Sequence, residues 1–172
     1  GGAVRMPFVP LGISFFTFQQ IWYLREVYAG TFSQVPTPAE YLTYSFFFPT
    51  VSSGPILKPE NFFPQLREAS PLPQDTAAGL YAIGLGLAKK VLLADAIGAL
   101  WTDIIGVADS PSTTFVGLAN ASTPLVWLGV IAYSLQLYFD FSGYSMMGIG
   151  MGKMLGFDFP ANFNYPYISA SI

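Results

Sequence analysis

The sequence predicts an all-α protein, a multi-pass transmembrane helical bundle with one broken or re-entrant segment. Hydrophobic residues make up 52% of the 172 residues and charged residues only 10%, whereas about 25% of an ordinary soluble domain is charged. Three runs of 17 to 30 residues carry no charge, and a spanning helix needs about 20 mostly apolar residues. Core helices of a large soluble protein are the alternative, but the aromatic-rich flanks of these runs favour a membrane.

Composition also excludes several kinds of function. The net charge of −3 argues against a nucleic-acid partner, because such a protein needs a basic face toward the phosphates. The chain contains neither cysteine nor histidine. Disulfides, thiolate nucleophiles, histidine-ligated metals and imidazole general bases are therefore excluded within these residues. We expect no cofactor and no metal site.

The first uncharged run, Met6 to Leu24, covers 19 residues between two arginines and is long enough to span. Pro10 suits the first turn of a helix, and Trp22 with Tyr23 suits an interfacial end. The second run, Tyr41 to Leu57, covers 17 residues.

Proline and glycine interrupt this second run at Pro49, Gly54 and Pro55, so it cannot be one straight helix. Irregular backbone at membrane depth survives only where protein or a water-filled cavity satisfies its hydrogen bonds. We therefore predict a re-entrant or interfacial segment.

The middle of the chain is more polar. Residues 58–75 hold five charges and four prolines and predict a surface loop with a short helix around Phe62 to Glu68. Helical sequence follows from Thr76 to Ala108. We expect one helix from about Asp75 to Leu93 and a second piece from Ala94, although a single helix of 33 residues would be about 50 Å long.

The last third begins with a loop, Ser110 to Thr123, that is rich in serine, threonine, proline and glycine. Pro124 to Phe139 is the best-defined spanning helix, since proline suits its start and Trp127 lies near an interface. From Phe157 onward the sequence indicates an aromatic and polar loop. Both ends of the chain look like cuts, so we expect an internal segment of a longer protein.

Asp140 is the most informative single residue. Thirty uncharged residues precede it and twelve follow it, so its carboxylate lies near or within the apolar zone. An acidic group there is costly and usually faces a partner or an aqueous cavity. A carboxylate at a helix end on the membrane surface is the alternative, and the sequence leaves both open.

The adjacent Lys89 and Lys90 have two interpretations. They suit a contact with phosphate or a lipid headgroup, or they form an interfacial pair whose charged ends reach toward water. Lys90 and Asp95 are five residues apart, so we do not expect them to pair along one face of an α-helix.

Small residues recur at Gly148, Gly152 and Gly156. This four-residue spacing predicts a ridge that lets helices approach closely.

Five motifs occur in order along the chain and together resemble the membrane-bound O-acyltransferase (MBOAT) family, closest to its bacterial alginate O-acetyltransferase branch. They extend over nearly the whole chain: Leu11–Gln19, Phe47–Ile56, Gly86–Asp95, Leu135–Ser145 and Phe159–Tyr167.

The resemblance implies a partial MBOAT fold, in which helices surround a funnel and an acyl group moves onto a hydroxyl. A histidine acts as general base in that family. This histidine is expected beyond Ile172, so the chain alone should be inactive. The candidates for lining the funnel, as polar residues within the matching motifs, are Gln136, Asp140, Tyr144 and Asn164.

The resemblance further implies a multi-pass protein of the cell inner membrane, with the whole chain, 1–172, belonging to one membrane domain cut at both ends. Its partners would be an acyl donor, an exported polysaccharide such as alginate, the lipid bilayer, and a periplasmic or carrier protein. Met146 stands where the alginate branch usually has aspartate. D-alanyl transfer to teichoic acid, a membrane transporter and a non-catalytic membrane partner remain the alternatives.

Overall fold

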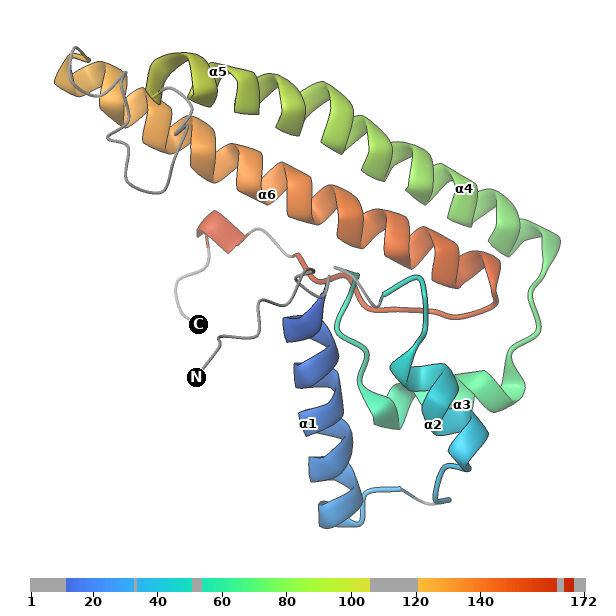
Figure 1. The fold of residues 1–172 in the computed structure, drawn as a ribbon. Helices are drawn as coiled ribbons and strands as arrows, with labels where there is room; N and C mark the ends of the chain where they lie inside the picture. Colours follow the sequence, from blue (N-terminus) through green and yellow to red (C-terminus); the bar gives the residue numbers. More distant parts are fainter. Residues whose placement is uncertain (1–11, 33, 51–53, 106–120, 164–165, 169–172) are drawn as a thin grey trace, which may run out of the picture.

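The computed structural model describes residues 12–32, 34–50, 54–105, 121–163 and 166–168, and all regular structure in these residues is helical. This confirms the all-α prediction. Figure 1 shows the helices in order: α1 (Ile13–Ala29), α2 (Pro38–Ser45), α3 (Pro59–Glu68), α4 (Pro73–Ala88), the π-helix η1 (Lys89–Ala94), α5 (Asp95–Ile105), α6 (Thr123–Met154) and the short 3-10 helix η3 (Pro166–Ile168). Pro10, residues 110–120 and Asn164, for which the sequence makes predictions, lie outside the described residues.

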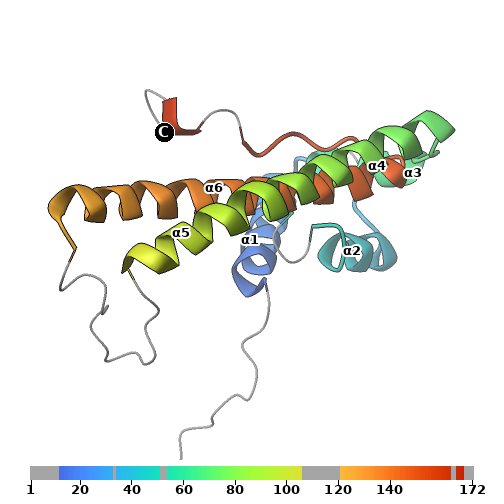
Figure 2. The same ribbon diagram turned by 90° about the horizontal axis from the view of Figure 1, so that it is seen from above.

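Two long antiparallel rods dominate the molecule. Helices α4, η1 and α5 follow one another without interruption from Pro73 to Ile105, and α6 runs back along them (Figures 1 and 2). At 1.5 Å per residue each rod is about 50 Å long. The predicted break between Leu93 and Ala94 is wrong, because a π-helical turn carries the chain through this region as a continuous helix.

Helix α6 begins next to Pro124, as predicted, but continues 15 residues beyond Phe139. Among the described residues it is the one helix that is long and apolar enough to cross a membrane, and only 17% of its most apolar window is buried. A core helix of a soluble protein would be mostly buried. One crossing is therefore supported, while the predicted multi-pass topology is not confirmed.

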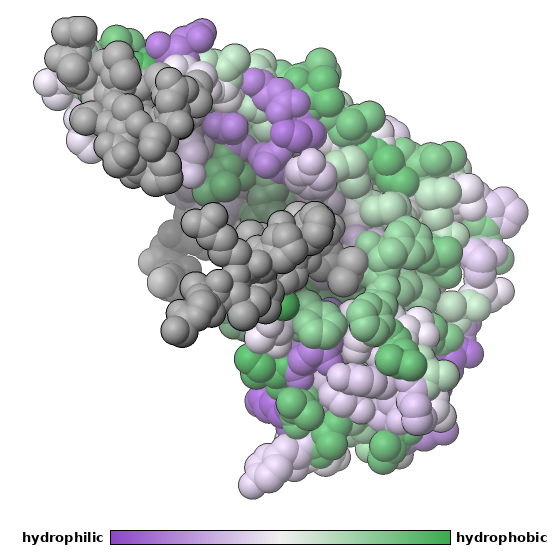
Figure 3. Space-filling model, in the orientation of Figure 1, coloured by the Kyte–Doolittle hydropathy of each residue, from purple (hydrophilic) through white to green (hydrophobic). Residues whose placement is uncertain are grey.

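Helix α1 has its polar face turned inward. Gln19 and Glu26 are only 6% and 4% exposed, whereas Phe18 and Leu24 are 62% and 64% exposed. In water a helix buries its apolar face instead. Green, hydrophobic residues also cover much of the face in view over α4 and around α1 (Figure 3). This inverted polarity fits a helix whose outer face meets lipid or other protein.

Of the predicted run Tyr41 to Leu57, residues 41–45 belong to α2, and the rest, which we call the broken segment, is non-helical where it is described, at 46–50 and 54–57. An aromatic core holds it in place. Its buried members come from the end of α2, the broken segment, α3 and the chain after α6, namely Tyr44, Phe47, Leu57, Phe62, Phe63, Phe157 and Phe159.

Ring contacts of 5.0–5.8 Å join these residues, as between Phe62 and Phe157 at 5.2 Å. Residues 58–75 are thus a loop only in part, because α3 inserts Phe62 and Phe63 into this core.

Candidate functional site

The two rods approach closely at two pairs of glycines. A Cβ atom built on Gly79 would lie 2.5 Å from the carbonyl oxygen of Gly150, and one on Gly150 would lie 2.6 Å from that of Gly79. Gly86 and Gly143 face each other in the same reciprocal way, at 2.6 and 2.8 Å. In both helices the two glycines are seven residues apart, a spacing that keeps them on one seam. Side chains here would push the backbones apart.

The glycine ridge expected at Gly148, Gly152 and Gly156 has a different role. A Cβ on Gly148 would meet Pro49 and Pro55 of the broken segment, and one on Gly152 would meet the ring of Phe159. Gly156 lies after α6 and adopts a φ of 84°, which favours glycine at the end of a helix. The expectation that this ridge packs against another helix is therefore wrong, because non-helical segments occupy this side of α6.

The π-helix η1 brings together residues that an α-helix would separate. Its backbone bonds join residues five apart, as in the hydrogen bond from the Asp95 N–H to the Lys90 carbonyl. The same spacing places Lys90 Nζ 2.6 Å from Oδ1 of Asp95. Our expectation that these residues do not pair is wrong for this reason. π-helical turns are frequent at functional sites.

Lys90 also reaches Asp140 across the two rods, with Nζ 2.9 Å from Oδ1. The two side chains therefore form an ion pair. Asp140 is the eighteenth of the 32 residues of α6, so it lies mid-helix and not at a helix end. Asp140 thus has a partner, as the first of the two interpretations expects.

Gln136 lies one turn from Asp140 on the face of α6 toward α5. Its side chain covers Gly98, where a Cβ would come within 2.6 Å of Nε2. Its Oε1 is buried and has no hydrogen-bond partner among the described residues. Tyr144 is 44% exposed and lies on the flank of α6. The structure thus brings together two of the four funnel candidates, Gln136 and Asp140, with Lys90.

A small cavity of about 100 Å³ lies beside the same crossing of η1 over α6. The backbone of η1 passes directly over Gly143, and Lys89 contributes to the cavity from η1. The other lining residues come from α6 and the segment that follows it: Ser142, Ser145, Met146, Ile149, Ala161, Asn162 and Phe163. The sequence did not single out Ser142, Ser145 or Asn162, because nothing in the order of residues shows that 161–163 returns to α6.

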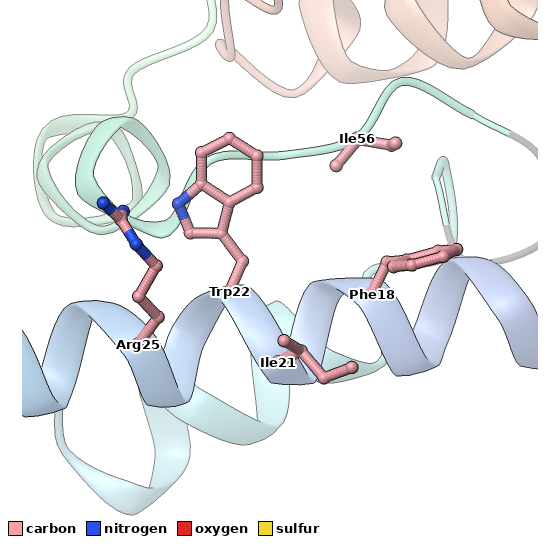
Figure 4. Close-up of a pocket in the computed structure, with 5 residues that line it drawn as sticks. All are labelled: Phe18, Ile21, Trp22, Arg25 and Ile56. Carbon is pink, nitrogen blue, oxygen red and sulfur yellow. The ribbon is translucent and has the colours of Figure 1, made fainter.

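A larger groove of about 550 Å³ opens between α1 and the segment that carries Ile56 (Figure 4). Its lining is Phe18, Ile21, Trp22, Arg25 and Ile56. Four of these five side chains are hydrocarbon or aromatic, and Arg25 is already paired with Glu26. Its lining is therefore mainly apolar, and the indole N–H of Trp22 is a buried donor without a partner among the described residues.

In the described part of the chain, no three histidine, cysteine, aspartate or glutamate side chains come together as a metal site would require. The concentration of polar groups in this apolar molecule is instead at the crossing of η1 over α6, which we define by Lys89, Lys90, Asp95, Gln136 and Asp140.

The sequence model of the membrane-bound O-acyltransferase family matches residues 14–168. The chain belongs to the membrane-bound O-acyltransferase family. The match includes every residue of the η1–α6 crossing, and it confirms the resemblance that the five motifs carry.

Three relatives show which kinds of protein this MBOAT chain is similar to. It is 40% identical to a probable alginate O-acetylase of Pseudomonas aeruginosa over 95% of its own length and 29% of the relative. It is 32% identical to a peptidoglycan O-acetyltransferase of Helicobacter pylori, covering 95% and 34%. It is 34% identical to a teichoic acid D-alanyltransferase of Bacillus subtilis, covering 94% and 39%. The chain thus spans about a third of the length of these relatives.

Proposed function

We propose that the complete protein is a membrane O-acyltransferase that moves an acetyl group onto hydroxyls of an exported polysaccharide such as alginate. The observation that carries this proposal is the 40% identity to a probable alginate O-acetylase over 95% of the chain. All three relatives named above are acyltransferases, which favours acyl transfer over transport or a non-catalytic partnership.

The reaction requires an acceptor hydroxyl to attack the acyl carbon of a thioester or similar donor. A new oxygen–carbon bond forms, the bond to the donor breaks, and a general base takes the hydroxyl proton and passes it to the leaving group. These 172 residues contain no histidine. In this proposal the imidazole base lies in sequence beyond Ile172, and the present residues bind and orient the acceptor.

Asp140 and Gln136 are the residues best suited to that orienting role. Asp140 lies 2.9 Å from the Lys90 ammonium, and an intramembrane acid commonly marks a substrate path. Gln136 offers an oxygen that no described residue uses. We include Tyr144 and Asn164 on the same acceptor path, since both are polar within the matched motifs.

We place the protein in the cell inner membrane as a multi-pass protein. Helix α6 supplies one crossing, and the rod α4–η1–α5 beside it supplies a second of similar length, about 50 Å. The outer face of this rod is apolar, with Leu80 and Leu92 57% and 69% exposed. The absence of cysteine from these residues suits single-cysteine labelling from either side of the membrane.

D-alanyl transfer to teichoic acid is the second candidate, because the Bacillus subtilis relative is 34% identical over 94% of the chain. Both reactions esterify a hydroxyl of an anionic envelope polymer. They differ in the acyl group, which a chemical assay identifies directly.

The deciding experiment expresses the complete protein in a host that makes alginate but lacks its own acetylase. Mild alkali then releases ester-bound acyl groups from the purified polymer for identification. We expect acetate in amounts that depend on the protein. D-alanine on teichoic acid in a parallel host, with no acetate on alginate, would support the second candidate. No ester on either polymer, despite normal protein in the membrane, would contradict the proposal.

A further inference from the structure

The cavity beside the η1–α6 crossing has the composition of a small binding site. It measures about 100 Å³, roughly the volume of three water molecules at about 30 Å³ each. One charged and several polar side chains line it, namely Lys89, Ser142, Ser145 and Asn162. It has room for a small polar group such as a carboxylate or a phosphate.

One of the two serine hydroxyls in this lining is free to donate a hydrogen bond to a ligand. Ser145 is only 2% exposed, and its Oγ finds no partner among the described residues. Ser142 is 4% exposed, and its Oγ makes one long bond, 3.4 Å, to the carbonyl of Phe139. A buried hydroxyl without a partner is costly, so a ligand that accepts a hydrogen bond here would be stabilised.

The charge of the cavity is positive. No ion pair joins Lys89 to a carboxylate of the described residues, and the lining holds no acidic side chain. The neighbouring carboxylates of Asp95 and Asp140 are both bound to Lys90. Lys89 is thus the cation left for a ligand, with the Ser145 hydroxyl as an additional donor. An ammonium and hydroxyl donors together bind oxyanions.

We propose that this cavity binds one oxyanion of the acceptor polymer, the carboxylate of a uronate sugar or the phosphate of a polyol phosphate. This inference rests on the proposed function and makes it more specific, because it assigns the acceptor to the polyanionic polymers. The charged group of one unit enters the cavity, while the ring or polyol of that unit stays outside. A neighbouring hydroxyl is thereby held in a fixed position relative to the crossing.

The test compares variants of the complete protein in acyl transfer and in binding. Lys89→Gln removes the cation. Lys153→Gln removes a lysine of α6 that lies outside this cavity and controls for net charge. Lys89→Arg keeps the cation and should retain function.

We expect Lys89→Gln to raise the KM for the anionic polymer by about tenfold, the loss of one charge-assisted hydrogen bond, with kcat nearly unchanged. Lys153→Gln should stay near wild type. With carboxyl-methylated polymer, which carries no charge, wild type and Lys89→Gln should have the same KM. Equal KM values for all variants on the anionic polymer would overturn the inference.

Binding of short oligomers to the purified protein separates this inference from the proposed function. An oligouronate and an oligo(glycerol phosphate) are the two probes, and the one that loses affinity in Lys89→Gln identifies the source of the oxyanion. Oligomer binding that depends on Lys89, without any acyl transfer, would support the oxyanion site and contradict the proposed enzyme activity. Acyl transfer together with oligomer binding that does not depend on Lys89 would support the enzyme activity and contradict the oxyanion site.

Discussion

The carboxylate of Asp140 lies in the middle of α6, the longest helix of the described residues, and Lys90 is its ionic partner. The two side chains are only partly exposed, 37% and 28%. Lys90 also forms an ion pair with Asp95, so one ammonium pairs with two carboxylates. Such a group is expensive to keep in an apolar setting, which points to use in the reaction.

Asp140→Asn tests that use. The amide keeps the size of the side chain but loses the charge, and Lys90 keeps Asp95. Because the pair is partly exposed, we expect a stability loss of about 1 kcal/mol or less and a fall in acyl transfer of at least about tenfold, more than 1.4 kcal/mol in the transition state. Transfer rate per folded protein in the membrane is the measurement. Asp103→Asn, an exposed carboxylate on α5, should leave the rate unchanged, and an equally active Asp140→Asn would remove Asp140 from the acceptor path.

Glu40 shows a different use of charge, outside the apolar rods. Its carboxylate caps α2 by accepting from the Thr37 N–H at 2.7 Å and binds Nε of Arg67 on α3 at 2.6 Å. The bond from Arg67 is the main cause that lowers the pKa of Glu40 from its ordinary 4.5 to about 2. The contact therefore stabilises the fold fully above about pH 4.5 and is lost as the pH falls through about 2.

Glu40→Gln isolates this contribution, because glutamine can still cap the helix but carries no charge. We expect the variant to melt at a lower temperature than wild type at pH 6, and the difference to shrink steadily between pH 4.5 and 2. Melting of the purified protein across this range is the measurement. A difference that is constant with pH would mean that the charge of Glu40 does not contribute.

At the scale of the elements, the seam between α4 and α6 depends on the absence of side chains. Gly79→Ala places a methyl group 2.5 Å from the Gly150 carbonyl, so the backbones must separate. Overpacking of this kind costs about 1–3 kcal/mol. Gly84 lies in the same helix with nothing within 4 Å of a new Cβ. Gly84→Ala should therefore be neutral or stabilising, by up to about 1 kcal/mol.

Thermal or denaturant unfolding of the two variants in the same detergent gives the comparison. The expected order of stability is Gly84→Ala, then wild type, then Gly79→Ala. If both alanine variants behaved alike, helix propensity and not close contact would govern this part of α4.

The sequence predicts elements well where local chemistry decides them. Pro124 begins α6 next to its predicted start, and Pro49 with Gly54 breaks the helix where expected. Prediction from the sequence fails where segments that are far apart along the chain come into contact. Nothing local shows that Lys89–Ala94 forms a π-helical turn, and this turn decides whether Lys90 meets Asp95.

Packing partners are similarly hidden. The sequence identifies Gly148 and Gly152 as small residues in a ridge. It does not show that their neighbours are the broken segment and Phe159. For the candidate site, residue type and motif indicated Asp140 and Gln136. The cavity lined by Lys89 and Ser145 forms because residues 161–163 lie against α6. The sequence alone does not show this contact, so the cavity could not be predicted from it.

At the scale of the whole molecule, polar side chains are buried and large apolar side chains are exposed, as expected for a protein in apolar surroundings. Glu26 and Gln19 face inward on α1, while the exposed residues of α6 include Trp127, Ile131 and Leu137 at 54–64%. An aqueous surrounding would make this surface a liability for aggregation. A bilayer, or further helices of the same protein in a bilayer, makes it the stable arrangement.

Leu137→Asp separates these two surroundings, because Leu137 is the fifteenth of the 32 residues of α6 and 56% exposed. An exposed position in water tolerates such a change within about 0.5 kcal/mol. At the centre of a spanning helix an aspartate costs about 2.5–3.5 kcal/mol on insertion scales. We expect the complete protein to stay in the membrane pellet after alkaline extraction. Leu137→Asp should lower the yield of folded protein in that pellet, although the other proposed crossings keep the chain in the membrane. Thr123→Asp, at the first residue of α6, should behave as wild type, since a helix start favours a carboxylate. Release of the wild-type protein by alkali, or a yield of folded Leu137→Asp protein equal to that of wild type, would mean that α6 does not cross the membrane.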